Sequence, residues 1–340
     1  MSDADRAAAY RVDALGVPST LAAYDTAMSR LDGPLAGLPK APARALAGRS
    51  GRILLVGMGS SRYAALTAAT FLRGRGLSVE VEMASTSHPT PPAPELTVVA
   101  ISSSGTTPEV IAAVERHRGR SALAAAITNR PDSPLAAAAE AVVPLLDAEE
   151  TGGVACRTYV ATVASLLLFA DRSTTAAPGS GYVPPAVRLA QSAADDLVSR
   201  MPLWQGQAAD LLDRADQLHV LGDAARYGSV EQAALVMREG PGLRAVAFDA
   251  GDWLHVGLYT AVPGIRAILF SGTDYDAEIA RVVSDRGGRL VVIGRPVDGA
   301  SLGIGHQAAD RLPASMLVET LVTDLIAAEL WHRADATERL

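Results

Sequence analysis

The segment 101–108 contains three serines, one glycine and two threonines between an apolar run and a run of helical character. It reads Ile101-Ser102-Ser103-Ser104-Gly105-Thr106-Thr107-Pro108. At the start of a helix the first backbone N–H groups lack intrahelical partners, and the helix dipole favours negative charge. Small hydroxyl side chains and a glycine allow such a turn to close around a phosphate. Pro108 suits the first helical turn, because its missing N–H would have no partner there. The residues alone are equally compatible with a well-capped polar turn.

Glu239 is a second candidate for chemistry. It ends a helical run and is followed by Gly240-Pro241-Gly242, a strong helix stop. A carboxylate at a helix C-terminus faces the negative end of the dipole, which tends to raise its pKa as a general base near neutrality requires. The alternative is a solvated glutamate at a frayed helix end, and the residues alone favour that alternative.

Composition limits the classes of protein to which the chain can belong. The 340 residues suffice for two domains of ordinary size, and 49% apolar residues provide for a substantial core. A net charge of −7 and a pI of about 5.4 argue against a nucleic-acid surface, although backbone dipoles can still bind a small anion. The one cysteine, Cys156, excludes a disulfide framework and a cysteine-based zinc site.

The sequence also bears on location. No apolar run is long enough to span a membrane, and the N-terminus lacks the basic start and apolar core of a signal peptide. We therefore expect a cytoplasmic protein that has neither a membrane nor a nucleic acid as partner. Lys40 is the one lysine in the sequence, which removes almost every Schiff-base lysine.

Apolar runs that alternate with helical patterns predict the architecture. Strands are expected at residues 52–57, 78–83, 96–101 and 122–128, and helices at about 61–73, 108–118, 132–139 and 155–171. Two further helices are expected near 3–13 and 18–31. Strands joined by helical crossovers form a parallel, doubly wound α/β sheet. Ligands of such sheets bind beyond the carboxyl ends of the strands.

A second α/β half is expected after residues 172–186, a stretch dense in Gly, Ser and Pro that has the composition of a linker. We therefore divide the chain into N-terminal helices (1–48), a first domain (49–171), this linker, and a second domain with a C-terminal helix (187–340).

The second half repeats the first with a period of about 165 residues, which predicts an internal duplication. Residues 218–222 form a strand that ends in glycine, as residues 54–57 do, and 271–273 open a helix with Ser-Gly-Thr, as 104–106 do. This comparison matches Phe270 to Ser103. Three hydroxyl residues then occur only in the first copy, so the first half is predicted to hold the anion: Ser102, Ser103 and Thr107.

Three stretches of the first half resemble the sugar isomerase (SIS) domain family. They are 57–61 (Gly-Met-Gly-Ser-Ser), 81–85 (Val-Glu-Met-Ala-Ser) and the serine-rich loop 102–107. The tandem arrangement is similar to the isomerase half of glucosamine-6-phosphate synthase and to fructosamine-phosphate deglycases. The resemblance extends over nearly the whole chain from about residue 20. It implies an α/β fold of two flavodoxin-like SIS domains with doubly wound parallel sheets.

In that family the serine-rich loop holds the phosphate of a sugar phosphate. The resemblance assigns this role to four residues of the loop: Ser102, Ser103, Ser104 and Thr107. It also implies sugar contacts by Ser61, in the first glycine loop, and by Val154 and Cys156, where cysteine replaces the family's serine. A small buried filler is the alternative for a lone cysteine. Glu149 and Glu150 are further candidate carboxylates near this site.

The segment from Arg238 to His255 resembles the family's Lys-Glu followed, at the same spacing, by Gly-Glu-Leu-Lys-His. The resemblance implies that Glu239 moves a proton between the first two sugar carbons and that His255 helps to open the sugar ring. In relatives this histidine reaches into the neighbouring subunit's site, which implies a homodimer. A satisfied core or interface histidine is the alternative for His255, because its run is apolar.

The resemblance implies an enzyme that acts on a sugar phosphate without a metal or an organic cofactor. The chain has no cysteine near its start and no lysine near its end. We therefore expect neither the glutaminase step nor the C-terminal lysine chemistry of the synthase. Aldose–ketose isomerisation and fructosamine-phosphate deglycation both stay open. A non-catalytic sugar-phosphate sensor or partner subunit is the alternative from another class, and it would need neither Glu239 nor His255 as a catalyst.

Overall fold

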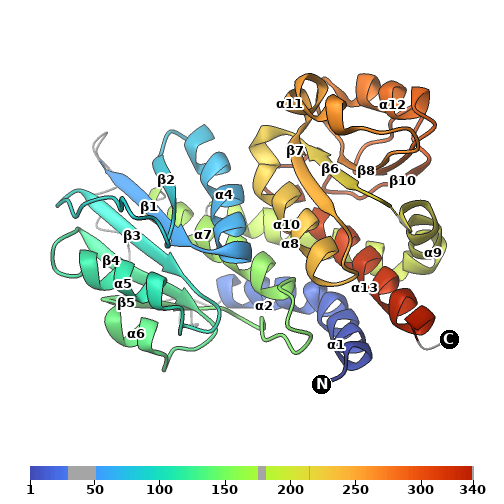
Figure 1. The fold of residues 1–340 in the computed structure, drawn as a ribbon. Coiled ribbons are helices and arrows are strands. Elements are labelled where there is room, and N and C mark those ends of the chain that lie inside the picture. The colour runs from blue at the N-terminus through green and yellow to red at the C-terminus, as the bar shows by residue number, and fades with distance from the viewer. Residues whose placement is uncertain (30–50, 175–180, 214, 339–340) are drawn as a thin grey trace. The chain divides into compact units, whose positions relative to one another are not determined.

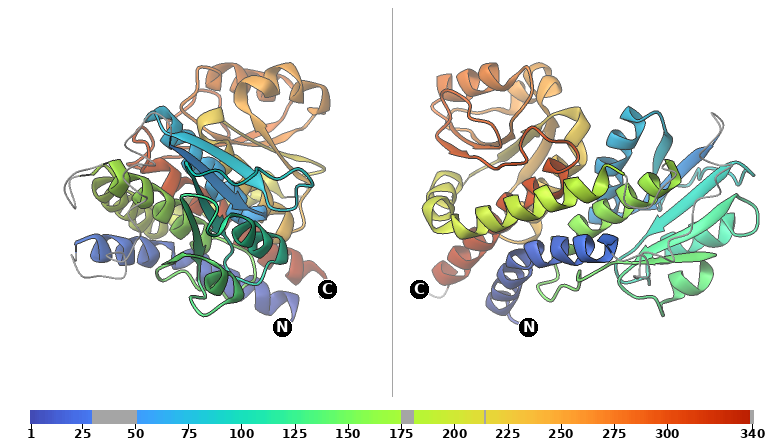
Figure 2. Two further views of the ribbon diagram at one scale, coloured as in Figure 1. Left: turned by 90° about the vertical axis from the view of Figure 1, so that its left-hand side faces the viewer. Right: turned by 180° about the vertical axis from the view of Figure 1, so that it is seen from behind.

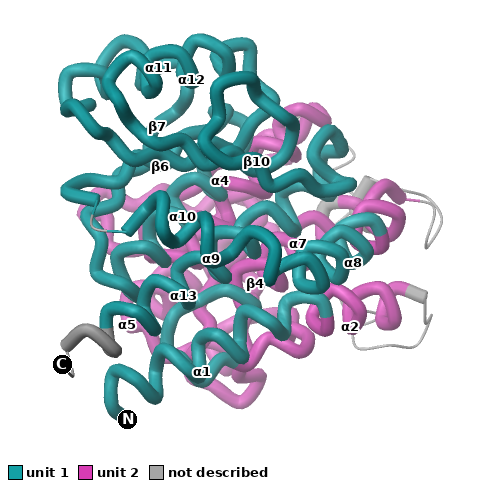
Figure 3. Tube along the Cα trace, turned by 90° about the vertical axis from the view of Figure 1, so that its right-hand side faces the viewer, with its two compact units in different colours: residues 1–18, 150–157, 189–340 teal, residues 19–149, 158–188 magenta. Residues whose placement is uncertain are grey.

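The structure is a computed structural model of the chain and describes residues 1–29, 51–174, 181–213 and 215–338. The chain forms two compact units, shown in separate colours in Figure 3. Unit 1 contains residues 1–18, 150–157 and 189–340, and unit 2 contains residues 19–149 and 158–188. The units therefore do not follow chain order, because the first helix and the loop 150–157 belong with the second half of the chain.

The sheet of unit 2 has five parallel strands in the order β2-β1-β3-β4-β5 (Figure 1). The strands are β1 (Arg52–Gly57), β2 (Ser78–Met83), β3 (Leu96–Ile101), β4 (Leu123–Thr128) and β5 (Ala141–Pro144). Every residue of β3 is buried, and so is every residue of β1 and β4 after the first. Such continuous apolar runs are typical of parallel strands that are covered on both faces.

Helices flank this sheet, and all but the first of them follow one of its strands. They are α2 (Val17–Ser29), α4 (Gly59–Gly74), α5 (Pro108–His117), α6 (Pro134–Ala138) and α7 (Arg157–Thr174). In α5 the buried residues Val110, Ala113 and Val114 recur at helical spacing on one face. Val110 and Val114 pack with Ala100 of β3 and Ala126 of β4 in one apolar cluster. This packing fixes the N-terminal end of α5, which the serine-rich loop precedes.

The sheet of unit 1 repeats this topology with the order β7-β6-β8-β9-β10. Its strands are β6 (Leu218–Gly222), β7 (Ala245–Asp249), β8 (Arg266–Phe270), β9 (Arg289–Ile293) and β10 (Leu302–Ile304). All the pairings are parallel. Counted along each sheet, the two orders are the same, strand for strand. The predicted fold class, two flavodoxin-like doubly wound sheets, is therefore confirmed.

The remaining helices belong wholly or mainly to unit 1. They are α1 (Asp3–Leu15), α8 (Val183–Ser199), α9 (Met201–Leu212), α10 (Tyr227–Glu239), α11 (Ala250–His255), α12 (Asp276–Asp285) and α13 (Glu319–Glu338), with short 3-10 turns at Ala224–Arg226, Gly257–Thr260 and Ser315–Leu317. The last boundary between the units along the chain falls inside α8, which runs as one uninterrupted helix (Figure 2).

Helix α1 packs against the last helix, α13, although the two lie at opposite ends of the chain. The Tyr10 hydroxyl donates to Asp324 Oδ1 at 3.0 Å, and Trp331 Nε1 donates to Asp3 Oδ2 at 2.9 Å. Tyr10 and Asp324 are almost completely buried. Ser2 caps α1 through a reciprocal hydrogen-bond pair with Asp5, which satisfies donors at the helix start. Long-range hydrogen bonds thus bring the N-terminal helix into the core of unit 1.

Most elements lie where the sequence predicts them. The strands at 52–57, 78–83 and 96–101 have the predicted bounds, and both N-terminal helices are present as α1 and α2. The rest of the predicted N-terminal region, 30–48, lies outside the described residues, as do residues 175–180 of the predicted linker. Helices α7 and α8 occupy the ends of that linker. Strands β5, β7, β8 and β10 were not predicted from the sequence, because they have only three to five residues and so show little periodicity.

Among the described residues, no helix combines the length and the apolar character needed to cross a lipid bilayer.

The buried carboxyl of Asp324 predicts a dependence of stability on pH. Burial raises the pKa of Asp324 well above its usual range, and the nearby Glu150 raises it further, while the hydrogen bond from Tyr10 lowers it. The folded state therefore favours the protonated acid more than the unfolded state does, and stability falls as the pH rises above the unfolded pKa. Asp324→Asn removes this titration but keeps an acceptor for Tyr10. We expect its stability relative to wild type to improve from pH 5 to pH 8 in urea unfolding. A constant difference between the two proteins across this range would contradict the assignment.

Candidate functional site

The serine-rich loop leaves β3 and enters α5 at the carboxyl edge of the sheet in unit 2. Ser102 Oγ lies 3.0 Å from Thr107 Oγ1 and accepts a hydrogen bond from Gly105 N at 3.2 Å. Ser102 is only 5% exposed. Its hydroxyl therefore braces the loop from the inside and joins its two ends, so this part of the loop is ordered by its own side chains.

Ser103 is held by the neighbouring strand. Its Oγ accepts a hydrogen bond from Asn129 Nδ2 at 3.0 Å, and its carbonyl accepts from Asn129 N at 3.1 Å. Asn129 also donates to the carbonyl of Ala148 and to Thr158 Oγ1. Asn129 was not predicted from the sequence. Asn129 is a polar residue directly after β4, and β4 pairs with β3, which leads into the loop. This position at the carboxyl end of a neighbouring strand could have indicated a role at the site.

The outer part of the loop presents donors to solvent. Ser104 and Thr106 are exposed, and their hydroxyl oxygens lie 2.9 Å apart. Thr107 is the N-cap residue of α5, but its side chain makes no capping hydrogen bond. Within the described part of the chain, the N–H groups of Ser103, Ser104 and Thr107 donate to no protein acceptor. The loop therefore offers hydroxyls and amide donors at the positive end of a helix.

Ser61 lies at the same edge of the sheet as this loop. It is in the first turn of α4, directly after β1, and β1 pairs with β3. Ser61 and the four residues predicted to bind phosphate therefore follow two adjacent strands of one sheet, within unit 2. The carboxyl ends of adjacent parallel strands account for this grouping.

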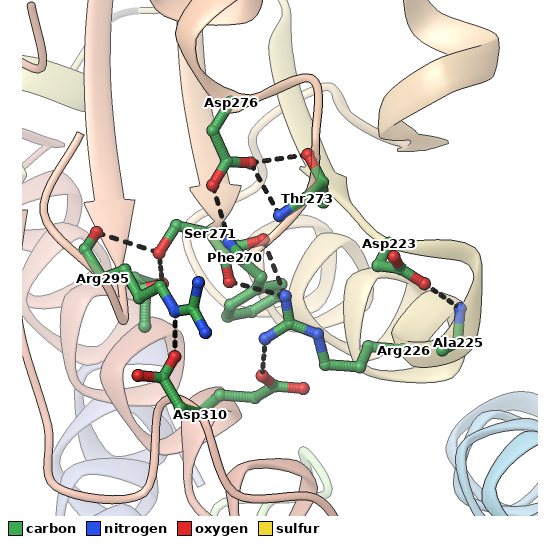
Figure 4. Close-up of polar contacts among 12 residues, drawn as sticks. Asp223, Ala225, Arg226, Phe270, Ser271, Thr273, Asp276, Arg295 and Asp310 are labelled. Atoms are coloured by element: carbon green, nitrogen blue, oxygen red, sulfur yellow. Dashed lines mark hydrogen bonds and ion pairs between the residues drawn. The ribbon is translucent and has the colours of Figure 1, made fainter. Parts of the chain in front are cut away.

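The corresponding loop of unit 1 is satisfied by an internal carboxylate (Figure 4). Asp276, the first residue of α12, accepts hydrogen bonds from Gly272 N at 2.6 Å, Thr273 N at 3.2 Å and Thr273 Oγ1 at 2.6 Å. A negatively charged group thus occupies the N-terminus of α12 and uses the donors of the loop. In unit 2, Glu109 stands in the first turn of α5 but forms no hydrogen bond with the serine-rich loop among the described residues.

Strand pairing corrects the predicted match between the two loops. Ile101 pairs with Ile127, and Phe270 pairs with Ile293. The next residues, Ser102 and Ser271, donate from their N–H groups to the carbonyls of Ile127 and Ile293 at 3.1 and 3.0 Å. Ser271 therefore corresponds to Ser102. The predicted match of Phe270 to Ser103 is wrong, and Ser102 is not a hydroxyl residue found only in the first copy. The shared Ser-Gly-Thr letters misled the comparison because the loops differ in length.

Arg226 binds the backbone at the start of the loop in unit 1 (Figure 4). Its guanidinium donates to the carbonyls of Phe270 at 3.1 Å and Ser271 at 2.7 Å. It also forms an ion pair of 2.9 Å with Glu319, and the two side chains are 8% and 1% exposed. The charge of Arg226 is therefore neutralised within the protein, and removal of either partner would leave a buried charge unpaired.

Glu239 is the last residue of α10, as the sequence predicts. The side chain is exposed at the helix end, yet partial desolvation raises the pKa of its carboxyl, while Arg238 and Arg6 act in the opposite direction. Arg238 donates to the carbonyl of Ala245 at 2.9 Å, which fixes this end of the helix to β7. The direction of the pKa shift is the one that a general base working near neutral pH requires.

The stretch that contains Val154 and Cys156 lies in unit 1, together with Glu239. Gln232 of α10 donates to the carbonyl of Ala155 at 2.6 Å, and the backbone N–H of Cys156 donates to Glu150 Oε1 at 2.5 Å. Val154 and Cys156 are each 1% exposed. Burial, Glu150 and Asp324 raise the pKa of the Cys156 thiol, so the thiol stays neutral at physiological pH.

Helix α1 holds the other end of this stretch. Asp13 accepts hydrogen bonds from Thr151 N at 2.8 Å and Gly152 N at 2.7 Å. A Cβ on Gly152 would lie 2.5 Å from the backbone of Tyr10, so only glycine fits this contact. This role of Asp13 was not predicted from the sequence. The residues around Asp13 give no indication of a partner more than a hundred positions away.

His255 lies at the end of α11 and is exposed. Large apolar side chains follow it on the surface: Val256, Tyr259 and Val262 are 55%, 90% and 53% exposed. The two glutamates considered near the first-half site have separate roles. Glu149 pairs with Arg130, and Glu150 binds the backbone as described above. No group of three or more His, Cys, Asp or Glu residues suited to a metal ion occurs in the described ranges.

These features define the class of the protein. It has two doubly wound α/β sheets, one of which carries a hydroxyl-rich loop with open backbone donors at a helix N-terminus. Residues 46–172 match the SIS domain family. This match confirms the resemblance recognised in the sequence for the first half of the chain.

Individual relatives agree with this family. The chain is 28% identical over 240 residues to the isomerizing glutamine–fructose-6-phosphate aminotransferase of Aeropyrum pernix, covering 68% of this chain and 39% of that relative. It is 38% identical over 121 residues to 3-hexulose-6-phosphate isomerase of Mycobacterium gastri, covering 35% of this chain and 60% of the relative. The chain thus spans only part of the length of either protein.

A solved structure extends the similarity in fold to the whole chain. The C-terminal domain of glucosamine-fructose-6-phosphate aminotransferase from Francisella tularensis superposes with a TM-score of 0.80 and 16% sequence identity, covering 96% of both chains. At this identity the match shows that the fold is shared.

Gly105 provides a test of how the serine-rich loop is built. Its φ of +65° favours glycine, and an added Cβ would lie 2.0 Å from Ser133 Oγ. Gly105→Ala should lower the free energy of unfolding by about 2 kcal/mol or more, because backbone strain and steric overlap add. Gly119 is the matched control: its φ is +66°, and no atom lies within 4 Å of the added Cβ. Equal losses for Gly105→Ala and Gly119→Ala in urea unfolding would show that Ser133 does not confine the loop.

Proposed function

We propose that this protein binds a phosphorylated sugar and that the serine-rich loop 102–107 binds the phosphate. The contrast between the two loops carries the proposal. In unit 1, Asp276 accepts from the donors of its loop, whereas in unit 2 no described carboxylate accepts from the serine-rich loop. A phosphate oxygen is the ligand that would use these donors as Asp276 uses its own. Ser61, Val154 and Cys156 are proposed to contact the sugar.

The proposed reaction is proton transfer between C1 and C2 of the sugar. Glu239 removes the proton from C2 of the open-chain aldose, which gives an enediolate with its charge on O1. The O2 hydroxyl proton then moves to O1, and Glu239 returns its proton to C1, which gives the ketose. Atoms and electrons balance without an oxidant or a cofactor. The raised pKa of Glu239 supports this role, because a base whose pKa lies nearer to neutrality both takes and returns a proton readily.

Two alternatives follow from the same site. A fructosamine-phosphate deglycase would use the same proton transfer and then release an amine. The isomerase is the first choice because one relative, from Mycobacterium gastri, carries that activity in its name. A non-catalytic sugar-phosphate sensor would use the serine-rich loop alone and would have no need of the shifted carboxyl at Glu239.

Proton exchange at C2 tests the base. The protein is incubated in deuterated water with a panel of hexose and hexosamine 6-phosphates, and the C2 proton signal is followed by NMR. We expect Glu239→Gln to lower the exchange rate by about 100-fold or more, since general-base catalysis contributes that much. Glu231→Gln removes the other carboxylate of α10 and should leave exchange unchanged.

The outcomes separate the three functions. Exchange lost in Glu239→Gln but kept in Glu231→Gln supports the enzyme, and release of a free amine from a fructosamine phosphate identifies the deglycase. Thermal stabilisation of the wild type by a sugar phosphate without exchange on any of them favours the sensor. No stabilisation by any phosphorylated sugar would overturn the proposed function.

We further propose a homodimer in which His255 acts at the partner's site. The support from this chain is the exposed apolar run that follows His255, with Tyr259 at 90% exposure. Solvent-exposed apolar groups of this size in one short segment indicate a contact surface.

Sedimentation velocity tests the dimer. The wild type should sediment as a dimer, and Tyr259→Ser should weaken association at least 10-fold, because a buried aromatic anchor typically contributes more than 1.4 kcal/mol to an interface. Leu203→Ser is the matched control, since Leu203 is 77% exposed on α9. A monomeric wild type, or equal effects of the two substitutions, would contradict this contact surface.

A further inference from the structure

Arg62 carries a charge that no described protein group balances. It lies in the first turn of α4, next to Ser61, and is only partly exposed. Its Nε is buried without a hydrogen-bond partner, and the Oγ of Ser60 in the same turn is also buried and unpartnered. Buried polar atoms almost always have a hydrogen-bond partner. Two such atoms without a partner in one helical turn are therefore compatible with a ligand that binds there.

Arg226 of unit 1 occupies a position similar to that of Arg62, and its contacts are known. Arg226 follows Gly222, the last residue of β6, by four positions, and Arg62 follows Gly57, the last residue of β1, by five. The guanidinium of Arg226 extends to the loop after β8, which is the strand next to β6. In unit 2, the strand next to β1 is β3, and the serine-rich loop follows it. Arg62 thus follows the strand next to the one that leads into the serine-rich loop, as Arg226 does in unit 1.

The two loops differ in how charge is balanced. In unit 1, Glu319 neutralises Arg226, and Asp276 accepts from the donors of the loop. Two carboxylates of the chain itself thus complete that arrangement. In unit 2, neither Arg62 nor the serine-rich loop binds a carboxylate among the described residues. An anion with several oxygen atoms would satisfy both.

We propose that Arg62 binds the phosphate group of the substrate together with the serine-rich loop and selects the dianion of a phosphate monoester. The inference rests on the proposed function of that loop. Hydroxyls and backbone N–H groups supply only partial charges, whereas a guanidinium supplies a full charge and a planar pair of donors that match two phosphate oxygens. Arg62 is thus a determinant of specificity for phosphorylated over unphosphorylated sugars.

Isothermal titration calorimetry with inorganic phosphate, glucose 6-phosphate and glucose tests this role. Arg62→Gln should weaken binding of both phosphates by about 10- to 100-fold, as expected for loss of a charge-assisted hydrogen bond. Arg62→Lys should fall between Arg62→Gln and the wild type, because it keeps the charge but loses the fork. Arg116→Gln is the matched control, since it removes the same charge from the last turn of α5, at the opposite end of that helix from the loop.

A pH series gives a readout that a structural role would not move. The second pKa of a phosphate monoester is about 6. Affinity of the wild type for glucose 6-phosphate should therefore fall between pH 7.5 and pH 5.5, and the fall should be smaller in Arg62→Gln. Because Arg62→Lys preserves the charge on the fold, it provides a second measurement if Arg62→Gln lowers the melting temperature.

Each outcome has one meaning. Wild-type affinity and an unchanged pH dependence in both Arg62 variants overturn the role of Arg62 and leave the proposed function intact. A wild type that binds neither phosphate nor any member of the sugar-phosphate panel overturns the proposed function itself. Equal weakening by Arg116→Gln would show that the effect is one of net charge and would also overturn the proposal.

Discussion

Backbone donors at the start of a helix need an acceptor, and this requirement shapes both halves of the molecule. In unit 1, the chain supplies the acceptor itself: Asp276 folds back onto Gly272 and Thr273, and Arg226 is neutralised by buried Glu319. In unit 2, the same strand order places the serine-rich loop at the equivalent helix start, and no carboxylate among the described residues accepts from its donors. The same topology thus produces one loop whose donors are bound by Asp276 and one loop in which the N–H groups of Ser103, Ser104 and Thr107 have no described protein acceptor.

The catalytic proposal depends on a different constraint, which is the environment of one carboxyl group. Glu239 ends α10, where the dipole opposes its negative charge, and partial desolvation raises its pKa further. The helix that carries it is tied to its surroundings by Gln232, which binds the carbonyl of Ala155, and by Arg238, which binds the carbonyl of Ala245. The carboxyl that would move the proton therefore projects from a rigid element, which favours a defined geometry.

The fold was largely predictable because its signals are local. Buried parallel strands such as β1 and β3 are continuous apolar runs in the sequence. In α5, Pro108 indicates the start of the helix, and Val110 and Val114 indicate the face that packs in the core. Short strands such as β5 and β10 carry too few residues for a period to show. The match of Phe270 to Ser103 was wrong because it was based on the shared Ser-Gly-Thr residues. Strand pairing determines where each loop begins, and it is not visible in the sequence.

The sequence by itself determined the α/β class, the two similar halves, the hydroxyl loop and the position of Glu239 at a helix end. Each of these depends on the order and spacing of neighbouring residues. Only the tertiary structure decided that α1 and residues 150–157 belong with the second sheet, that Asp13 holds Thr151 and Gly152, and that Asn129 holds Ser103. Those contacts join side chains to groups that are distant in the chain, so they exist only once the sheets have formed and brought strand ends and helix ends together.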